Sequence, residues 1–275
     1  MQSNHHFRGS SMATKKVALI LAGAFAGITN CAMANDNTTP ALNCGAPADF
    51  QWLADALGKS SGQPAHIQAV TSANALSLCE VRLESGNLVY SRPGDKTIMV
   101  GRLYGVSGDS IVDLTQTSLE ATNQSLLKNI KKDDYVAYSP SQPAKAFIYV
   151  MTDVDCAYCR KLHKEIPDLN KAGIEVRYLP YVRSGRQGSA WNTMSNVWCS
   201  AGDRKLLLDE AMTGKKLERQ ECGETVLERY QDFGRQTQLQ GTPHILFNDG
   251  RSQSGSSADL VSKALSSASN YTATN

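Results

Sequence analysis

Residues 147–166 read FIYVMTDVDCAYCRKLHKEI, and this stretch decides the fold. Its first five residues form a nearly continuous apolar run of the kind found in buried strands. Apolar side chains then recur at helical spacing, at Cys159, Leu162 and Ile166. Pro167 is expected to end or kink this helix. Two cysteines three residues apart therefore stand where a buried strand passes into a helix.

The sequence after this stretch continues the alternation of strand and helix. Gly173 precedes a second expected strand at residues 174–179, and two strands joined by a helix of this length imply a parallel, right-handed β-α-β unit. Further along, the pattern predicts a helical region, a terminal hairpin and a last helix, in residues 191–198, 242–253 and 259–265. The C-terminal half is thus expected to be built around one β-α-β unit.

The N-terminal half has a different pattern. Short β-rich runs separated by turn signals occur in residues 66–106, and residues 50–57 carry apolar side chains on one helical face. This predicts a small α+β unit with a thin core, which often needs a partner to be stable. Residues 117–130 then have leucines at helical spacing before the proline-containing stretch 139–143, which predicts a helical linker. The alternative is a helix packed into one continuous core.

The first residues of the chain indicate a compartment. Lys15 and Lys16 precede an uncharged apolar run and then Ala32-Met33-Ala34, the pattern of a secretory signal that is cleaved after Ala34. The alternative is a retained membrane anchor. Cleavage would remove three basic residues and change the formal net charge from +2 to −1. This balance gives no reason to expect nucleic acid as a partner.

The cysteine count fits an oxidising compartment. Six cysteines follow the leader, and an even number suggests pairs. Two of them, Cys44 and Cys79, lie in the N-terminal half, where an intrachain disulfide would tie the first segment to the sheet. A bridge between subunits and two free thiols are the alternatives.

The position of the two central cysteines suggests redox chemistry. A thiol at a helix N-terminus meets unpaired backbone N–H groups and the positive end of the helix dipole, and both lower its pKa. Two basic residues follow the pair and add to this effect, whereas two nearby aspartates oppose it. The first cysteine of such a turn is the more exposed, so Cys156 is the expected nucleophile. Cys159 lies inward and is the expected resolving thiol.

Two other uses of the pair compete with redox chemistry. Zinc needs four ligands, commonly from two paired clusters, but the other cysteines are isolated and only His66, His163 and His244 follow the leader. A structural disulfide is the stronger alternative, although so small a loop restricts the unfolded chain little. A CxxC pair between strand and helix in a β-α-β unit is the thioredoxin-like arrangement, which favours a redox-active pair without a metal or a dissociable cofactor.

Gly241-Thr242-Pro243 supports this interpretation. It stands directly before an apolar strand, where proline is allowed at the first residue. Thioredoxin-like folds carry a cis-proline at this point, facing the CxxC turn. In that form Pro243 would present the backbone of Thr242 for strand-like pairing with a bound polypeptide, so both residues are expected to support the active site.

Five segments stand in a specific order along the chain: VMTDVDCAYCRKLH, GIEVRYLP, VWC, EC and GTP. This series resembles the DsbC/DsbG family of periplasmic disulfide isomerases over most of residues 74–265. The resemblance implies an α+β protein with a C-terminal thioredoxin-like domain that has a helical insertion, a small cystatin-like N-terminal dimerisation domain and a helical linker. The expected boundaries are 1–34 for the leader, 35–112 for the dimerisation domain, 113–143 for the linker and hinge, and 144–275 for the catalytic domain.

The same resemblance assigns further residues. It implies a second disulfide between Cys199 and Cys222 in the helical insertion, with independent buried thiols as the alternative. Ala157 stands where relatives have glycine or proline, whereas Tyr158 is shared. Because the dipeptide between the cysteines influences the redox potential, both residues bear on the chemistry of the pair.

The resemblance also implies a function. The expected protein is a homodimeric disulfide isomerase of the periplasm, which reduces and reshuffles wrong disulfides in misoxidised or unfolded secreted proteins. Sustained activity needs an electron donor, and the family implies a membrane reductase of the DsbD type. The alternatives are a DsbG-like chaperone or thiol reductase with narrow clients, and an oxidase that donates its own disulfide.

Overall fold

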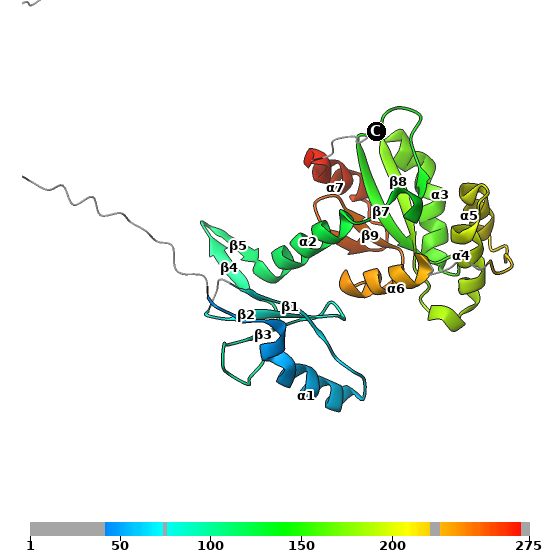
Figure 1. Ribbon diagram of the computed structural model, residues 1–275. Helices are drawn as coiled ribbons and strands as arrows, with labels where there is room; N and C mark the ends of the chain where they lie inside the picture. Colours follow the sequence, from blue (N-terminus) through cyan, green and yellow to red (C-terminus); the bar gives the residue numbers. More distant parts are fainter. Residues whose placement is uncertain (1–41, 74–75, 221–225, 271–275) are drawn as a thin grey trace, which may run out of the picture. The chain divides into compact units, whose positions relative to one another are not determined.

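The computed structural model describes residues 42–73, 76–220 and 226–270 (Figure 1). The expected leader, residues 1–34, lies outside the described residues. Two regions follow each other along the described chain: an N-terminal region, residues 42–113, and a C-terminal region, residues 131–270. Helix α2 (Leu114–Leu127) stands between them in sequence.

The N-terminal region is a small α+β unit, as its pattern of short apolar runs predicts. Strands β1, β2 and β3 form an antiparallel sheet, and β4 pairs with β5 in a separate hairpin. Leu53 of α1 packs with Val81 and Val89 of the sheet in a small buried cluster. The elements are α1 (Gln51–Ser61), β1 (Ile67–Ser72), β2 (Cys79–Leu83), β3 (Leu88–Ser91), β4 (Tyr104–Ser107) and β5 (Ser110–Asp113).

Two expectations for this part of the chain need adjustment. The apolar run around Met99 makes only an isolated bridge with Tyr90 rather than a strand. Helix α2 begins three residues before the expected start, because Asp113 accepts a hydrogen bond from the Gln116 N–H at 2.8 Å and caps it. Leu127, in the last turn of α2, packs in a buried cluster with aromatic residues of β7.

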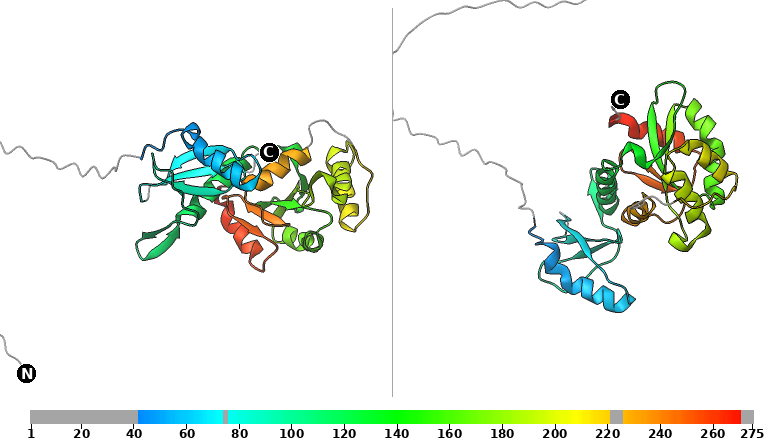
Figure 2. Two further views of the ribbon diagram at one scale, coloured as in Figure 1. Left: turned by 90° about the horizontal axis from the view of Figure 1, so that it is seen from below. Right: turned by 45° about the vertical axis from the view of Figure 1, so that its right-hand side comes forward.

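The C-terminal region is built on a mixed sheet in which the described strands have the order β10-β9-β7-β8-β6 (Figures 1 and 2). Strands β7 and β8 are parallel and α3 connects them, which confirms the predicted β-α-β unit. The other neighbouring strands are antiparallel. The elements are β6 (Val136–Tyr138), β7 (Ala146–Thr152), α3 (Ala157–Lys171), β8 (Ile174–Pro180), α4 (Ser189–Cys199), α5 (Arg204–Met212), α6 (Val226–Gln236), β9 (His244–Phe247), β10 (Ser252–Ser254) and α7 (Leu260–Ser266).

Strand β7 is buried on both faces, as its continuous apolar sequence predicts. Ile148 and Val150 point into a core shared with α3, α4, α5 and α7. Tyr149 and Met151 point to the other face, into a second cluster that includes residues of α6. The central strand is therefore held between two hydrophobic layers, and its C-terminal end places the cysteines.

Helix α3 does not end at Pro167. It continues to Lys171, because Pro167 lies on the exposed face while Ile166 and Leu169 are buried on either side of it. The missing N–H of the proline costs one intrahelical bond, but the apolar face continues to pack against the sheet beyond it. Packing of this face outweighs the local preference of proline to stop a helix.

Candidate active site

The two central cysteines lie at the junction between β7 and α3. Strand β7 ends at Thr152, and Cys156 is the N-cap residue of α3, with extended backbone angles of φ −90° and ψ 119°. The sulfur therefore stands at the helix end where backbone N–H groups lack intrahelical partners. Cys156 and Cys159 are both free thiols. Their placement at a strand-to-helix junction agrees with the sequence.

Cys156 faces the loop before β9. Its Sγ donates a hydrogen bond to the carbonyl oxygen of Thr242 at 3.2 Å, and the peptide bond between Thr242 and Pro243 is cis. The Thr242 hydroxyl is buried and has no hydrogen-bond partner among the described residues, so it is free to donate to the sulfur when the thiol loses its proton. Residues 86 positions apart in sequence thus meet at one sulfur atom.

The surroundings of Cys156 favour its thiolate. Burial raises the pKa of this thiol, but hydrogen bonds from Thr242, from Cys159 and from the N–H of Tyr158 lower it by more. The net pKa lies below the ordinary value of a cysteine. A lowered thiol pKa is the property that a disulfide-exchanging nucleophile needs near neutral pH.

Cys159 has the opposite character. It is completely buried, and burial is the main cause that raises its thiol pKa well above the ordinary value; a negative charge on Cys156 raises it further. The two sulfurs of the pair are therefore unequal, with a reactive first thiol and a protonated second thiol. This order is the one expected of a nucleophile and a resolving cysteine.

Cys156 itself is more deeply placed than the sequence argument assumed, since only 3% of its surface is exposed. The dipeptide after it is on the surface: Ala157 is exposed, and Tyr158 is 72% exposed. Burial of Cys156 follows from its contact with the Thr242 loop, which covers the sulfur. The sequence around Cys156 gives no sign of this burial, because the covering loop comes from a distant part of the chain.

Charged residues that were not singled out from the sequence hold the active-site loop. The buried carboxylate of Asp153 accepts hydrogen bonds from Nε and the backbone N–H of Arg183, at 3.1 and 3.0 Å. Asp155 is bound by Lys216 Nζ at 2.5 Å and by the Ser189 hydroxyl at 2.6 Å. Both aspartates are therefore held by hydrogen bonds and ion pairs to partners from the segments after β8. No motif in the sequence marks these partners, which lie 30 to 61 residues away.

Three further cysteines of the described residues take part in disulfides. Cys44 and Cys79 are bonded with an S–S distance of 2.09 Å, which ties the first described segment to β2. Cys199, at the end of α4, is disulfide-bonded. Cys222 lies outside the described residues, so the pairing of these two cysteines stays a prediction.

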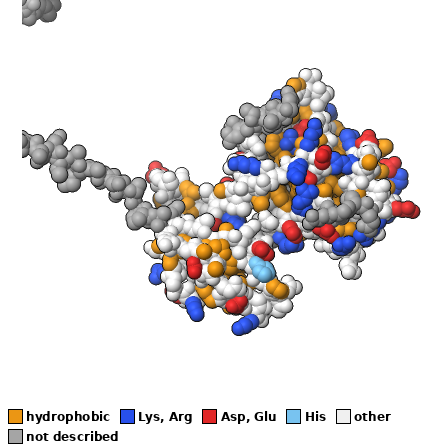
Figure 3. All heavy atoms as spheres, in the orientation of Figure 1, with side chains coloured by type: hydrophobic (Ala, Val, Ile, Leu, Met, Phe, Trp, Pro, Cys, Tyr) orange, Lys and Arg blue, Asp and Glu red, His pale blue; other side chains and the backbone are white. Residues whose placement is uncertain are grey.

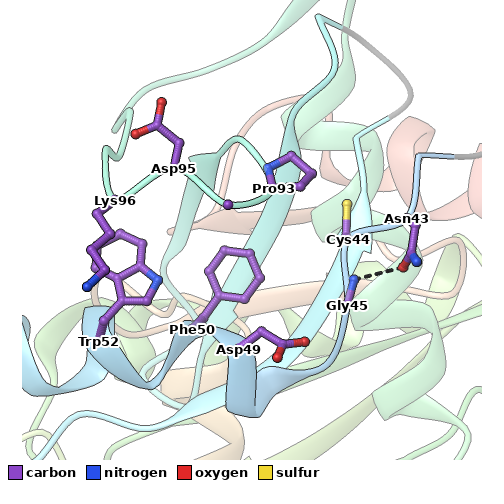
Figure 4. A pocket seen from close by; sticks show the side chains of 10 residues that line it. Asn43, Cys44, Gly45, Asp49, Phe50, Trp52, Pro93, Asp95 and Lys96 are labelled. Carbon is purple, nitrogen blue, oxygen red and sulfur yellow. Dashed lines mark hydrogen bonds between the residues drawn. The ribbon is translucent and has the colours of Figure 1, made fainter.

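The N-terminal region contains a pocket that plays no part in this chemistry. It has a volume of about 390 Å³ and lies beside Cys44 (Figure 4). Phe50 and Trp52 line it from the segment at the start of α1, and Pro93 and Lys96 line it from the loop after β3. None of its lining residues belongs to the CxxC turn or the Thr242 loop.

Among the described residues, no group of three or more His, Cys, Asp or Glu side chains could hold a metal ion. Within the same part of the chain, none of the helices combines the length and the apolar character needed to cross a bilayer.

Comparison with known proteins identifies the fold and the family. Residues 136–265 match the family model of a thioredoxin-like domain. The thiol:disulfide interchange protein DsbC of Salmonella typhimurium is 34% identical over 205 residues, which cover 74% of this chain and 81% of the relative. DsbC of Dickeya dadantii is 38% identical over 62% of this chain and 68% of the relative, and DsbC of Escherichia coli is 31% identical over 74% and 82%.

These matches agree with the geometry around the two thiols. The thioredoxin-like fold, the expected family and the expected oxidoreductase class are confirmed. A lowered pKa at Cys156, a raised pKa at Cys159 and a cis-proline beside them are features suited to exchanging disulfides. The chain belongs to the DsbC family of thiol:disulfide interchange proteins.

Proposed function

We propose that this protein is a disulfide isomerase in which Cys156 is the nucleophile and Cys159 the resolving thiol. The observation that carries the proposal is the contrast between the two sulfurs. Cys156 caps a helix and its pKa is lowered, whereas Cys159 is fully buried and its pKa is raised. A reactive first thiol and a protonated second thiol suit a reaction that passes through a mixed disulfide.

The reaction begins when the Cys156 thiolate attacks one sulfur of a client disulfide. A bond forms between enzyme and client, the client S–S bond breaks, and the second client sulfur leaves as a thiolate. If this thiolate attacks another disulfide of the client, and the freed client sulfur then displaces Cys156, the client is isomerised and the enzyme is unchanged. If Cys159 attacks Cys156 instead, the client is released with two electrons gained and the enzyme is left oxidised.

Thr242 and Pro243 would bind the client next to the reacting sulfur. Thr242 lies against Cys156 through its carbonyl, and Pro243 directly precedes β9. An extended client segment could pair with the backbone here, as strands pair with exposed edges. Tyr158, which is exposed beside the nucleophile, offers an aromatic surface to the same segment.

Refolding of scrambled ribonuclease in a glutathione buffer tests this function. Cys156→Ala is expected to abolish the recovery of ribonuclease activity, because no mixed disulfide can form. Cys159→Ala serves as the matched control, since it should still isomerise while mixed disulfide accumulates. Equal recovery with wild type and Cys156→Ala would refute the assignment of the nucleophile.

The protein is proposed to act as a homodimer through residues 35–112. Large apolar side chains are exposed in this region, among them Val100, Val106 and Ile111, which are 75%, 80% and 77% exposed. Figure 3 shows hydrophobic side chains on the visible surface of the described residues. An apolar surface of this kind on a two-stranded hairpin suits burial against a second copy. The remaining exposed members are Leu76, Ile98, Met99 and Tyr104.

Sedimentation of variants tests the dimer. The double variant Val106→Asp, Ile111→Asp is expected to sediment as a monomer, because two charges cannot be buried unpaired in an apolar interface. Leu206→Asp is the control, since Leu206 is 57% exposed but lies on α5 of the C-terminal region. A dimer that survives the double variant would contradict the proposed interface.

The proposed location is the periplasm, reached through the signal that ends at Ala34. The proposed clients are misoxidised or unfolded secreted proteins, and a membrane reductase of the DsbD type would return electrons to the pair. The double variant Cys156→Ala, Cys159→Ala separates this enzyme from a chaperone. A chaperone would keep suppressing aggregation of a client without cysteines, whereas scrambled ribonuclease would no longer be repaired.

A further inference from the structure

A buried carboxylate lies three residues before the proposed nucleophile. The side chain of Asp153 is only 2% exposed, so water screens its charge weakly. Its Oδ1 accepts a hydrogen bond from the N–H of Asp155 at 2.8 Å, and its backbone carbonyl accepts one from the N–H of Cys156 at 3.0 Å. The carboxylate is therefore folded back against the short turn that ends at Cys156.

A negative charge at this place bears on the reactivity of Cys156. A carboxylate near a thiol disfavours the thiolate and raises the thiol pKa. Asp153 on its own would therefore oppose the thiolate that the start of α3 favours. The carboxylate needs a counter-charge if Cys156 is to react near neutral pH.

Arg183 supplies this counter-charge. It lies three residues after the end of β8, and its Nε donates a hydrogen bond to Oδ2 of Asp153 at 3.1 Å. Burial lowers the pKa of the Arg183 guanidinium, but the hydrogen bond to Asp153 and the charges of Asp153 and Cys156 raise it by more. Arg183 is therefore a cation at every pH at which a thiol titrates. Its side chain is 47% exposed, so water screens part of this charge.

Arg183 also holds the turn through its backbone. Its N–H donates to the same Oδ2 of Asp153 at 3.0 Å, and the N–H of Tyr181 donates to the carbonyl of Thr152 at 2.9 Å. The segment after β8 is thus fastened to the end of β7 and to the turn by backbone groups. Any residue other than proline at position 183 retains them. The charge at this position can therefore be removed while the backbone contacts remain.

The other carboxylate of the turn has several partners. Asp155 accepts hydrogen bonds from Lys216 and Ser189, and it lies 3.5 Å from a terminal nitrogen of Arg160. Loss of one of these partners leaves the others in place. Among the described residues, the ion pair of Asp153 is formed with Arg183. The charge of Asp153 is therefore more sensitive to a single substitution than the charge of Asp155.

We propose that Arg183 is a positioning residue that acts on Cys156 through Asp153, fixing the turn before the nucleophile and offsetting the carboxylate charge beside its thiolate. The inference rests on the proposed role of Cys156 as the nucleophile. Arg183 needs no contact with the sulfur or with a client for this role. Its effect is that the helix N-terminus and the Thr242 loop can stabilise the thiolate without opposition from Asp153.

Alkylation of the reduced protein by iodoacetamide over a range of pH tests this role. The reagent is uncharged, so its rate follows the fraction of Cys156 that is present as thiolate. Mass spectrometry assigns the label to Cys156. A wild-type Cys156 that is no more reactive than an ordinary thiol would refute the proposed function itself. The comparison between variants tests the inference about Arg183 alone.

Arg183→Gln is the decisive variant, because it removes the cation and keeps the backbone bond to Asp153. Its pH profile should shift upward, and alkylation below the thiol pKa should be about threefold slower, a modest effect because the guanidinium is partly screened. Asp153→Asn should shift the profile downward, since the cation then remains without its carboxylate. The double variant Arg183→Gln, Asp153→Asn lacks both charges and should return close to wild type. Arg183→Lys keeps the charge and should also stay close to wild type.

Arg251→Gln is the matched control. Arg251 binds the carboxylate of Asp249 through its backbone N–H and its Nε, at 3.1 and 2.7 Å, which are the same two contacts that Arg183 makes with Asp153. This second pair lies in the turn after β9, at the opposite end of that strand from Pro243. Alkylation of Cys156 should therefore be unchanged in Arg251→Gln.

The sign of the shifts separates an effect of charge from an effect of packing. Opposite shifts in Arg183→Gln and Asp153→Asn would support the proposal, because loosening of the turn would move both variants in the same direction. Equal profiles for wild type and Arg183→Gln would overturn it. Shifts of the same sign in the two single variants would overturn it as well, and so would a shift in Arg251→Gln as large as that in Arg183→Gln.

Discussion

His244 should make the stability of this protein depend on pH. It is the first residue of β9, it is 3% exposed, and neither ring nitrogen has a hydrogen-bond partner among the described residues. Burial lowers its pKa from 6.5 to about 4. The unfolded chain therefore binds a proton at a higher pH than the folded chain does, so stability is fully present above the unfolded pKa and is lost as the pH falls.

The size of the effect follows from these two pKa values. Between about pH 7.5 and about pH 5, protonation of the unfolded state should remove about 2 kcal/mol of unfolding free energy. Urea unfolding followed by tryptophan fluorescence measures it, because Trp191 and Trp198 are buried in the same region. In His244→Leu this part of the pH dependence should be absent, since leucine carries no proton.

The difference between the wild-type and His244→Leu curves is the quantity to compare, because other groups titrate equally in both. His66→Leu is the control, since it makes the same substitution at an exposed histidine. Its curve should run parallel to wild type. Parallel curves for His244→Leu and wild type across this range would refute the reasoning.

Three other variants have expected outcomes. Thr242→Val removes a hydroxyl that donates to the nucleophilic thiolate. Alkylation of Cys156 near neutral pH should therefore be about threefold slower, with its pH profile shifted upward. An unchanged pH profile would contradict this role of the hydroxyl. Gly234→Ala should destabilise the protein by about 1–3 kcal/mol in urea, because the added Cβ would lie 2.5 Å from a ring carbon of Tyr181; unchanged stability would show that the ring can move aside. The double variant Cys44→Ala, Cys79→Ala should lower the free energy of unfolding by about 4 kcal/mol, since the disulfide closes a loop of 35 residues. Thermal unfolding measures this loss, and a melting temperature equal to that of wild type would show that packing alone holds the loop.

The sequence predicted those parts of the fold that depend on local patterns. The apolar run of β7, the helix that begins after Cys156 and the parallel return strand are all encoded in residues 147–179, where periodicity and chain connectivity allow few arrangements. Pro167 shows the limit of this approach. Its local preference to stop a helix is clear from sequence, but the burial of Leu169 that overrides it depends on the sheet beneath.

The candidate site also has residues that the sequence predicted and residues that it did not. The CxxC pair and the Thr-Pro dipeptide could be found because each is a short motif with a fixed place in a thioredoxin-like fold. Arg183 and Lys216 could not, because single residues of these types are common and acquire a role only through contacts across the fold. Burial of Cys156 was missed for the same reason, since the cover comes from residue 242.

The depth of the Cys156 sulfur bears on which clients can be repaired. Because only a small part of Cys156 is exposed, a client disulfide has to come close to the protein surface at this point to react. A disulfide in a flexible segment can reach the Cys156 sulfur, whereas a disulfide in a rigid core cannot. We therefore expect disulfides in flexible segments of a client to react faster than disulfides in a rigid core.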